Sequence, residues 1–434
     1  MQLEKLVTDL HPPLTSHEAS VESDRCYFCH DAPCVTACPT GIDIPMFIRQ
    51  INTGNPNSAA KTIFSQNIFG GMCARDCPTE TLCEQACVRN TAEEQPVRIG
   101  ELQRHATDSL MQTGEQPFSR AAASGKRIAV IGAGPAGISC AHRLSTYGHD
   151  VVVFDARSKA GGLNEYGIAA YKTVDNFAQQ EVDYICSIGG ISFEFEKKLG
   201  ESLLLDDLVK QYNAVFIGFG LAGVNELTVP GAELEGVVDA VSFIADLRQA
   251  EDYDAFGRAI DNPQDVVVIG GGMTAIDAAM QSRLLGAANV TIAYRRGFEH
   301  MNASEVEQHL AQTNGISIKP WLQPKAIHGS NGKVSEIEFS TVQLDNGKLV
   351  ETGDTRRIPA DRVYKAIGQS LSPDALTIAG LEMKGGRIQV NDDRQTGHAS
   401  IWAGGDCIGI SEDLTVSAVQ DGKLAAESIH RSFS

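Results

Sequence analysis

The first strong pattern in the chain is an apolar run, a helical repeat and a second apolar run. IAVIGAG (128–134) is rich in β-branched residues, a helical pattern extends from 135 to about 147, and VVVFDA (151–156) follows. Such runs lack the alternation of a half-exposed strand and are typical of strands buried on both faces of a parallel sheet. The pattern therefore predicts a strand, a helix and a second, parallel strand.

The same order returns about 138 residues later in the chain. VVVIGGG (266–272) is followed by a helical pattern from 274 to about 285 and by VTIAY (290–294). Near the end, the short run IWAGGD (401–406) precedes a helical pattern over about 414–432. Two such βαβ units predict a multidomain chain with two α/β, Rossmann-like dinucleotide-binding domains.

The first 118 residues have a different composition. They are rich in cysteine, interrupted by proline, and contain short helical patterns such as IPMFIRQI (44–51). A polar stretch from 113 to 126 separates this block from the first βαβ unit. A length of 434 residues also predicts about three domains. We expect an α-helical domain at 1–118, followed by the two α/β domains.

The charge balance limits the classes of partner. The chain has 36 Lys and Arg against 55 Asp and Glu, which gives a formal net charge of −19. Nucleic acids and anionic membranes are bound through clustered positive charge, so neither is expected as a partner. The sequence also has no apolar signal-peptide core and no apolar run near the ~18 residues of a membrane span. We therefore expect a cytoplasmic protein.

The turn after the first strand has the spacing of a dinucleotide-binding fingerprint. Its first glycine permits a tight turn, its second lets a pyrophosphate approach the backbone, and its third lets the helix pack on the strand. Asp155 ends the next strand, where a carboxylate can accept a ribose hydroxyl. The candidate residues of the turn are Gly132, Gly134, Pro135, Ala136 and Gly137.

The second fingerprint differs at the end of its second strand. Arg295 and Arg296 follow that strand in place of an acid, and arginine there can pair with the 2′-phosphate of NADP. Glu299 and Glu305 lie close by and would repel such a phosphate, so arginines that contact only the pyrophosphate or solvent remain the alternative. The candidate residues of this turn are Gly270, Gly271, Gly272, Thr274 and Ala275.

Eight of the eleven cysteines lie in two groups, CYFCHDAPCVTACP (26–39) and CARDCPTETLCEQAC (73–87). In a chain without a signal peptide, such crowding argues against disulfides and for metal. Iron–sulfur clusters need several thiolates at one point, and a CxxC…C…CP run is typical of a pair of clusters. Zinc ribbons favour paired CxxC knuckles, which the second group lacks. The spacing favours two [4Fe–4S] clusters over zinc or disulfides.

GGL (161–163) after the first unit and GGD (404–406) near the end add a family resemblance. With the two fingerprints, they resemble the flavoproteins that have two dinucleotide-binding domains, also called pyridine nucleotide–disulfide reductase-like. The resemblance implies that the first unit and the terminal segment form an FAD-binding domain built from 119–232 and 365–434. It also implies that the inserted unit, at 233–364, binds NAD(P)H. No CxxxxC redox disulfide follows the first fingerprint. The further FAD-binding residues that it implies are Gly162, Leu163, Gly405, Asp406 and Thr415.

The segment MCARDCPTETLCEQAC (72–87) and Gln103 carry a closer resemblance. The whole chain resembles the electron-input half of dihydropyrimidine dehydrogenase and the small subunit of glutamate synthase, which usually has glutamate where this chain has Gln103. The pyrimidine pattern implies that Cys73 is not a ligand. It implies one cluster held by Cys26, Cys29, Cys34 and Cys87, and another held by Cys38, Cys77, Cys83 and Gln103.

The resemblance implies an electron relay from NADH through FAD to the clusters. No barrel for a pyrimidine substrate is present, so the implied partner is a separate FMN- and iron–sulfur-containing subunit that reduces uracil or thymine, in a heterotetramer. No catalytic acid or base is expected in this chain. NADH is favoured over NADPH, because relatives that use NADPH have an arginine where this chain has Asn302 and an apolar residue at Glu299.

Two other functions stay open. The first is a glutamate synthase small subunit or an NAD(P)H:ferredoxin-type oxidoreductase subunit, which has the same modules. The second, from another class, is a redox sensor or scaffold that binds flavin and clusters without turnover. One segment departs from the family pattern: IAAYKT (168–173) stands where most relatives read IPxFRLP.

Overall fold

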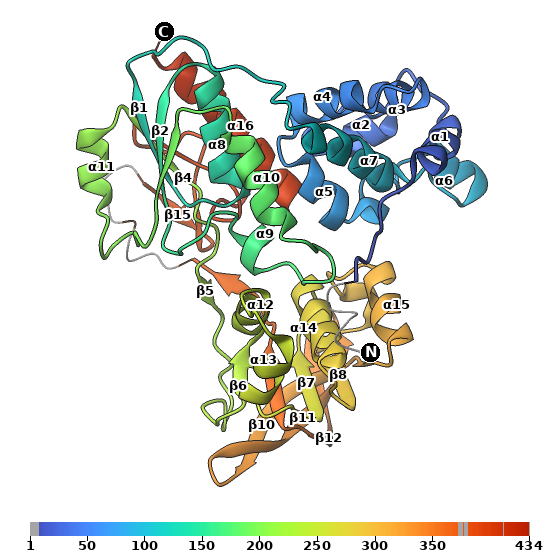
Figure 1. The fold of residues 1–434 in the computed structure, drawn as a ribbon. Coiled ribbons are helices and arrows are strands. Elements are labelled where there is room, and N and C mark those ends of the chain that lie inside the picture. Colours follow the sequence, from blue (N-terminus) through green and yellow to red (C-terminus); the bar gives the residue numbers. More distant parts are fainter. Residues whose placement is uncertain (1–7, 372–375, 377–380, 411, 434) are drawn as a thin grey trace. The chain divides into compact units, whose positions relative to one another are not determined.

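The computed structural model describes residues 8–371, 376, 381–410 and 412–433 (Figure 1). The chain divides into two compact units. The smaller unit contains Tyr166–Asp175 and Val224–Gln369, and the larger unit contains His11–Glu165, Asn176–Gly223 and the chain from Ser370 onward. Because the larger unit holds both the cysteine-rich block and the first βαβ unit, the three domain boundaries drawn from the sequence stay predictions.

The cysteine-rich block contains helices and no strand between residues 11 and 118, as the sequence predicts. A capping box of Thr15 and Glu18 begins the first helix, and Asp43 caps the third. Phe47, Ile63 and Leu102 lie in its core with 0% of their surfaces exposed. The helices are α1 (Ser16–Asp24), α2 (Pro33–Ala37), α3 (Ile44–Asn52), α4 (Pro56–Gln66), α5 (Gly70–Asp76), α6 (Val88–Glu93) and α7 (Ile99–Thr113).

The first βαβ unit belongs to a five-stranded parallel sheet in the larger unit, in the order β17-β4-β1-β2-β3. The terminal strand therefore joins the sheet beside β4, far from its neighbours in sequence. The strands are β1 (Arg127–Ile131), β2 (Asp150–Phe154), β3 (Ile191–Glu194), β4 (Ala214–Ile217) and β17 (Ile401–Ala403). The helices of this part are α8 (Pro135–Thr146), α9 (Leu163–Tyr166), α10 (Phe177–Cys186), α11 (Leu205–Gln211) and α16 (Thr415–Arg431).

Helices α8 and α16 lie side by side against this sheet (Figure 1). They approach so closely at Gly422 that a Cβ atom there would lie 2.1 Å from the carbonyl oxygen of Ala136. Gly405, before α16, packs on the same helix, since its Cβ would lie 3.0 Å from the Ala136 Cβ. The crossing therefore packs α16 and the segment before it against Ala136, which belongs to the first glycine-rich turn.

The second βαβ unit forms a separate parallel sheet in the smaller unit, in the order β6-β13-β7-β8-β9. Its strands are β6 (Val237–Asp239), β7 (Asp265–Ile269), β8 (Asn289–Ala293), β9 (Ser317–Lys319) and β13 (Arg362–Lys365). The helices are α12 (Ala240–Arg248), α13 (Tyr253–Ala259), α14 (Met273–Leu284) and α15 (Glu305–Thr313). Two Rossmann-like sheets and a helical block agree with the predicted fold class.

The smaller unit also contains an antiparallel sheet that the sequence patterns did not predict. Its strands are β10 (Leu322–Ser330), β11 (Lys333–Asp345) and β12 (Lys348–Pro359), paired in that order. Ile337 and Phe339 are fully buried in its middle strand, whereas most of β12 is exposed. Because the outer strand β12 is polar and mostly exposed, its sequence lacks the alternation of apolar and polar residues that predicts a strand.

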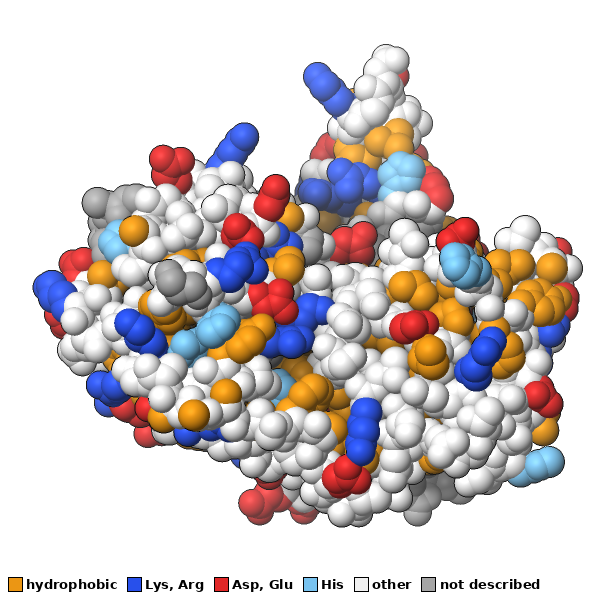
Figure 2. All heavy atoms as spheres, turned by 90° about the horizontal axis from the view of Figure 1, so that it is seen from above, with side chains coloured by type: hydrophobic (Ala, Val, Ile, Leu, Met, Phe, Trp, Pro, Cys, Tyr) orange, Lys and Arg blue, Asp and Glu red, His pale blue; other side chains and the backbone are white. Residues whose placement is uncertain are grey.

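The surface carries both signs of charge. On the face drawn in Figure 2, Lys and Arg side chains are interspersed with Asp and Glu side chains. Within the part of the chain that the structure describes, none of the helices combines the length and the apolar character that crossing a membrane requires.

The crossing at Gly422 can be tested by adding a single methyl group. We expect Gly422→Ala to destabilise the larger unit by about 1–3 kcal/mol, because its Cβ has no room beside the Ala136 carbonyl. The measurement is urea unfolding followed by circular dichroism. Glu427→Ala, on a partly exposed position of the same helix, should change stability by less than about 0.5 kcal/mol. Equal stability of Gly422→Ala and wild type would contradict the packing argument.

Candidate functional site

The first glycine-rich turn forms a backbone cradle. Gly132 has φ +102°, and a Cβ at Gly137 would lie 1.9 Å from the Gly132 carbonyl oxygen, so strand and helix touch through their backbones. A Cβ at Gly162 would lie 2.7 Å from the Gly134 Cα atom. The Gly161 N–H donates to the Ala133 carbonyl oxygen at 2.7 Å. The GGL turn therefore packs directly against the fingerprint.

Asp155 follows β2 and lies beside this cradle. Its carboxylate accepts hydrogen bonds from the N–H groups of Ala133 at 2.7 Å and Arg157 at 2.8 Å. Burial raises the pKa of this carboxyl group, and the two N–H groups oppose that effect. The structure thus places Asp155 at the end of β2, and its contact with a ribose hydroxyl stays a prediction.

The GGD turn is held by a buried carboxylate that the sequence reasoning missed. Asp421 of α16 accepts from the Gly405 N–H at 3.0 Å and from the Arg394 Nε at 2.7 Å. This pairing fixes the backbone that presents Asp406. Burial, helped by the nearby Asp413, raises the pKa of Asp406 to about 6. A charged residue within an otherwise apolar face of the last helix was the signal that could have identified Asp421.

Thr415 begins α16 and faces the first site. Its hydroxyl donates to the Asn164 side-chain oxygen at 2.8 Å, which ties the start of the helix to the segment after the GGL turn. Leu163, the last residue of the GGL turn, is 42% exposed. The predicted FAD-binding residues Gly132, Gly134, Pro135, Ala136, Gly137, Asp155, Gly162, Leu163, Gly405, Asp406 and Thr415 all belong to the larger unit.

The second glycine-rich turn lies at the carboxyl edge of its own sheet, in the smaller unit. A Cβ at Gly270 would lie 2.2 Å from the Ala366 carbonyl oxygen, and one at Gly271 would lie 2.6 Å from the Tyr294 ring. Gly272, the residue before α14, has no atom within 4 Å of its Cβ position. Ala275 is fully buried. The turn is closed by the protein on one side and open at the start of the helix, beside Thr274.

Two arginines follow β8 beside this turn. Arg295 is exposed and Arg296 is half-buried, and neither makes an ion pair with a described residue. The side chain of Glu299 lies within 3.4 Å of the His300 ring. Glu305 is exposed in the first turn of α15. Two cations and two carboxylates therefore remain available to a nucleotide here.

The first set of cysteines, which the resemblance assigns to one cluster, consists of Cys26, Cys29, Cys34 and Cys87. Electrostatic interactions link these four thiols. Cys26 interacts with Cys87 and Cys29, and Cys34 interacts with Cys87 and Cys26. The Phe28 N–H donates to the Cys26 sulfur at 3.4 Å. Burial and the neighbouring thiols raise the pKa of Cys34 to about 12. All four thiols are half-buried.

The second set consists of Cys38, Cys77, Cys83 and Gln103, and its thiols Cys77 and Cys83 lie deeper among the helices. Cys77 interacts with Cys73, Cys83 and Cys38, and burial raises the pKa values of Cys77 and Cys83 well above their usual range. Gln103 is buried on α7, which packs against α5. Its Nε2 donates to the Gly70 carbonyl oxygen at 2.7 Å, which fixes the side-chain amide beside the helix that carries Cys73.

The chemistry of these side chains fits iron–sulfur ligation. All eleven cysteines are free thiols. Cys26, Cys34 and Cys87 interact, as do Cys38, Cys77 and Cys83, in line with the two sets that the resemblance implies. Cys83 also interacts with Cys34, so the two sets adjoin and the interactions alone do not separate them. Among the described residues, no three Cys, His, Asp or Glu side chains lie close enough to hold a single metal ion. A cluster spreads its ligands more widely than a single ion does, so the two sets remain candidates.

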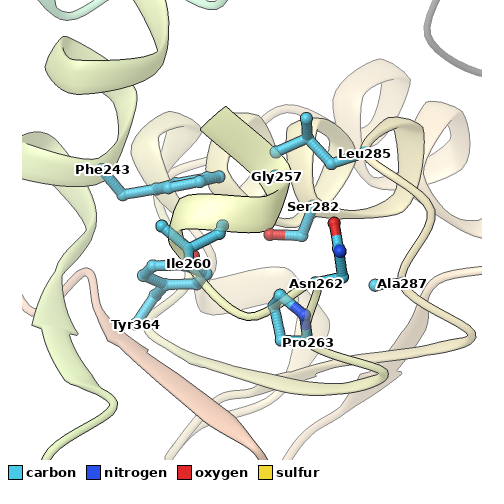
Figure 3. Close-up of a pocket in the computed structure, with 9 residues that line it drawn as sticks. All are labelled: Phe243, Gly257, Ile260, Asn262, Pro263, Ser282, Leu285, Ala287 and Tyr364. Carbon is cyan, nitrogen blue, oxygen red and sulfur yellow. The ribbon is translucent and has the colours of Figure 1, made fainter. Parts of the chain in front are cut away.

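A small hollow in the smaller unit lies away from the glycine-rich turn of that unit (Figure 3). Phe243 and Tyr364 stack in it with ring centroids 4.3 Å apart. Asn262 and Pro263 come just before β7, at the amino edge of the sheet, whereas dinucleotides bind at the carboxyl edge. We therefore place no functional site in this hollow.

Comparison with proteins of known sequence gives full-length similarity. The chain is 34% identical over 430 residues to the NAD-dependent dihydropyrimidine dehydrogenase subunit PreT of Escherichia coli K12, covering 99% of this chain and 98% of PreT. It is 32% identical over 442 residues to the glutamate synthase [NADPH] small chain of the same organism, covering 97% and 93%.

Solved structures share the fold at low identity. FprA of Mycobacterium tuberculosis in complex with NADPH has a TM-score of 0.58 at 18% identity, covering 71% of this chain and 84% of FprA. Thioredoxin reductase of T. acidophilum has a TM-score of 0.55 at 20% identity, covering 71% of this chain and all of that structure (100%).

Family models divide the chain in two. The model for dihydropyrimidine dehydrogenase domain II with its 4Fe-4S cluster matches residues 3–115, and the model for pyridine nucleotide-disulphide oxidoreductase matches residues 126–422. The matches imply an oxidoreductase with FAD, a nicotinamide cofactor and a 4Fe-4S cluster. The chain therefore belongs to the pyridine nucleotide-disulphide oxidoreductase family, in the group similar to the glutamate synthase small subunit that adds an N-terminal iron–sulfur domain.

Proposed function

We propose that the chain is the electron-input subunit of a dihydropyrimidine dehydrogenase. It would pass a hydride from NADH to FAD and then single electrons through two [4Fe–4S] clusters to a PreA-like partner that contains FMN and iron–sulfur clusters. That partner would reduce uracil or thymine reversibly to the 5,6-dihydropyrimidine, within a heterotetramer. The observation that carries the proposal is the 34% identity to PreT over 99% of the chain.

The order of carriers follows from their chemistry. A nicotinamide gives up two electrons as a hydride, a cluster takes one electron at a time, and flavin can do both. The chain's own residues would supply binding and positioning. The cradle at Gly132 and Gly134 takes the pyrophosphate, Asp155 takes a ribose hydroxyl, and Asp421 holds the turn that presents Asp406 to the rest of the cofactor.

The cysteine groups suggest where electrons leave the chain. In the second set Cys83 is buried and Cys38 and Cys77 are half-buried, whereas all four thiols of the first set are half-buried. The second set also lies near α16, through an interaction of Cys38 with Lys423. We therefore assign the second set to the cluster that receives electrons from the flavin. The first set, nearer the surface, would pass them to the partner.

The alternative is a glutamate synthase small subunit, which 32% identity over 97% of the chain also supports. Gln103 favours the pyrimidine assignment, because the resemblance puts a glutamate at this position in glutamate synthase subunits. A non-catalytic sensor would bind the same cofactors and differ only in turnover. The partner protein and the turnover therefore separate the three functions.

The anchoring role of Asp421 predicts a loss of FAD affinity. Asp421→Ala removes a carboxylate that accepts from Gly405 and Arg394, at a cost of about 1.5–3 kcal/mol per charged hydrogen bond. We expect FAD to bind at least about tenfold more weakly, measured by fluorescence titration of the flavin-free protein. Asp393→Ala, which removes an exposed carboxylate paired with Arg431, serves as the control. Unchanged affinity in Asp421→Ala would contradict the assignment.

The cofactor preference can be tested at Glu299. If this carboxylate repels a 2′-phosphate, wild type should prefer NADH, and Glu299→Gln should raise kcat/KM for NADPH by up to about tenfold. The value for NADH should stay the same. Glu351→Gln, an exposed charge on β12, is the matched control. A wild-type protein that prefers NADPH would refute the NADH proposal.

The function itself is tested by reconstitution. NADH added anaerobically should bleach the flavin absorbance band of the isolated chain. Uracil-dependent NADH oxidation should require a separate FMN-containing partner, found by co-purification. A chain whose flavin does not bleach is a scaffold or sensor. A chain that bleaches but co-purifies with an amidotransferase, and oxidises NADH only with glutamine and 2-oxoglutarate, is a glutamate synthase subunit.

A further inference from the structure

Lys423 is a buried lysine in the last helix of the chain. It is 8% exposed, and it lies one residue after the glycine at which α16 crosses α8. Its ammonium group points into the cysteine-rich helices. There it donates to the Gln66 carbonyl oxygen at 3.1 Å, the Gln66 Oε1 at 3.1 Å and the Thr40 carbonyl oxygen at 3.4 Å. Each of these acceptors is a neutral oxygen.

The charges around Lys423 do not balance within the described residues. No carboxylate lies within ion-pair distance of its Nζ atom. The charged side chains that act on it are Arg143 and Glu427, and the neutral thiol of Cys38 is a weaker influence. Arg143 and Glu427 lie 3.9 Å from each other. Burial lowers the pKa of Lys423 to about 8, so the group is mostly charged at neutral pH.

A buried ammonium group without a paired carboxylate is costly, and an apolar side chain would fill the same space more cheaply. Cys38 is the member of the second set of cysteines that acts on Lys423. Its sulfur lies 3.3 Å from the Thr40 hydroxyl, and the carbonyl of the same threonine accepts from Lys423. A thiolate-ligated cluster at the second set would place a negative charge on this side of the lysine.

The position of Lys423 along α16 adds a second argument. Eight residues separate it from Thr415, so the two lie about 12 Å apart along the helix. Thr415 belongs to the proposed flavin site, and Cys38 belongs to the proposed second cluster. The lysine therefore lies on the helix that connects the two redox sites.

We propose that Lys423 is a positioning residue for charge, one that raises the reduction potential of the second cluster and so favours electron transfer from the flavin. This inference rests on the proposed function. A fixed positive charge stabilises the reduced cluster, which carries one more negative charge than the oxidised cluster. The residue does not touch substrate and takes no part in bond formation.

The test is a redox titration of the loaded protein, followed by electron paramagnetic resonance of the reduced clusters. In Lys423→Met and Lys423→Gln, the midpoint potential of the second cluster should fall, with the ratio of reduced to oxidised cluster at a fixed potential lower by about tenfold, or about 59 mV. Lys423→Arg should keep the wild-type potential. The first cluster should not change. Lys210→Met, on the exposed side of α11, is the control for removal of a lysine.

Each outcome decides between separate claims. A wild-type protein without iron and sulfide refutes the proposed function, whatever Lys423 does. If clusters are present and Lys423→Met or Lys423→Gln keeps the wild-type potential, even with a lower melting temperature, the residue is only structural and the inference is wrong. If Lys423→Met does not load clusters, the comparison of Lys423→Gln with Lys423→Arg decides. Loss of clusters from all three variants also refutes the charge argument.

Discussion

The backbone contact between α8 and α16 is the constraint on which the larger unit depends. A helix that starts at the first glycine-rich turn and a helix near the end of the chain can meet only where both have small residues, at Ala136 and Gly422. The meeting point fixes the GGD turn next to the GGL turn. The predicted FAD-binding residues Gly162 and Gly405, far apart in sequence, therefore lie against the same short segment, residues 134–136.

Three consecutive residues of α16 contact three different parts of the larger unit. Asp421 faces the GGD turn, Gly422 touches α8, and Lys423 points into the cysteine-rich helices. Helical geometry separates successive side chains by about 100°, so three consecutive side chains can contact three different parts of the protein.

A second buried group also links the cysteine-rich helices to the part that contains the first βαβ unit. Glu181 of α10 accepts from the Gly71 N–H of α5 at 2.7 Å, and burial raises the pKa of Glu181 to about 8.

The sequence was most informative where a local pattern has a local cause. The runs at 128–134 and 266–272 predicted their strands, because a fully buried parallel strand needs continuous apolar residues. The helices after them were expected to begin at 135 and 274. In the structure α8 begins at Pro135 and α14 begins at Met273. Asp421 and Lys423 were not identified, because their roles depend on partners from distant parts of the chain. The antiparallel sheet of β10–β12 was missed because its outer strand is polar.

Burial of the thiols has a further consequence for how the cysteine-rich helices become functional. Burial raises the pKa of Cys34 to about 12 and that of Cys77 well above its usual range, so these thiols are neutral at physiological pH. Ligation needs thiolates, so incorporation of the two proposed clusters would release protons from both sets. The same event would give the buried Lys423 its counter-charge. Cluster binding and the stability of the contact between α16 and the cysteine-rich helices are thus expected to be coupled through charge.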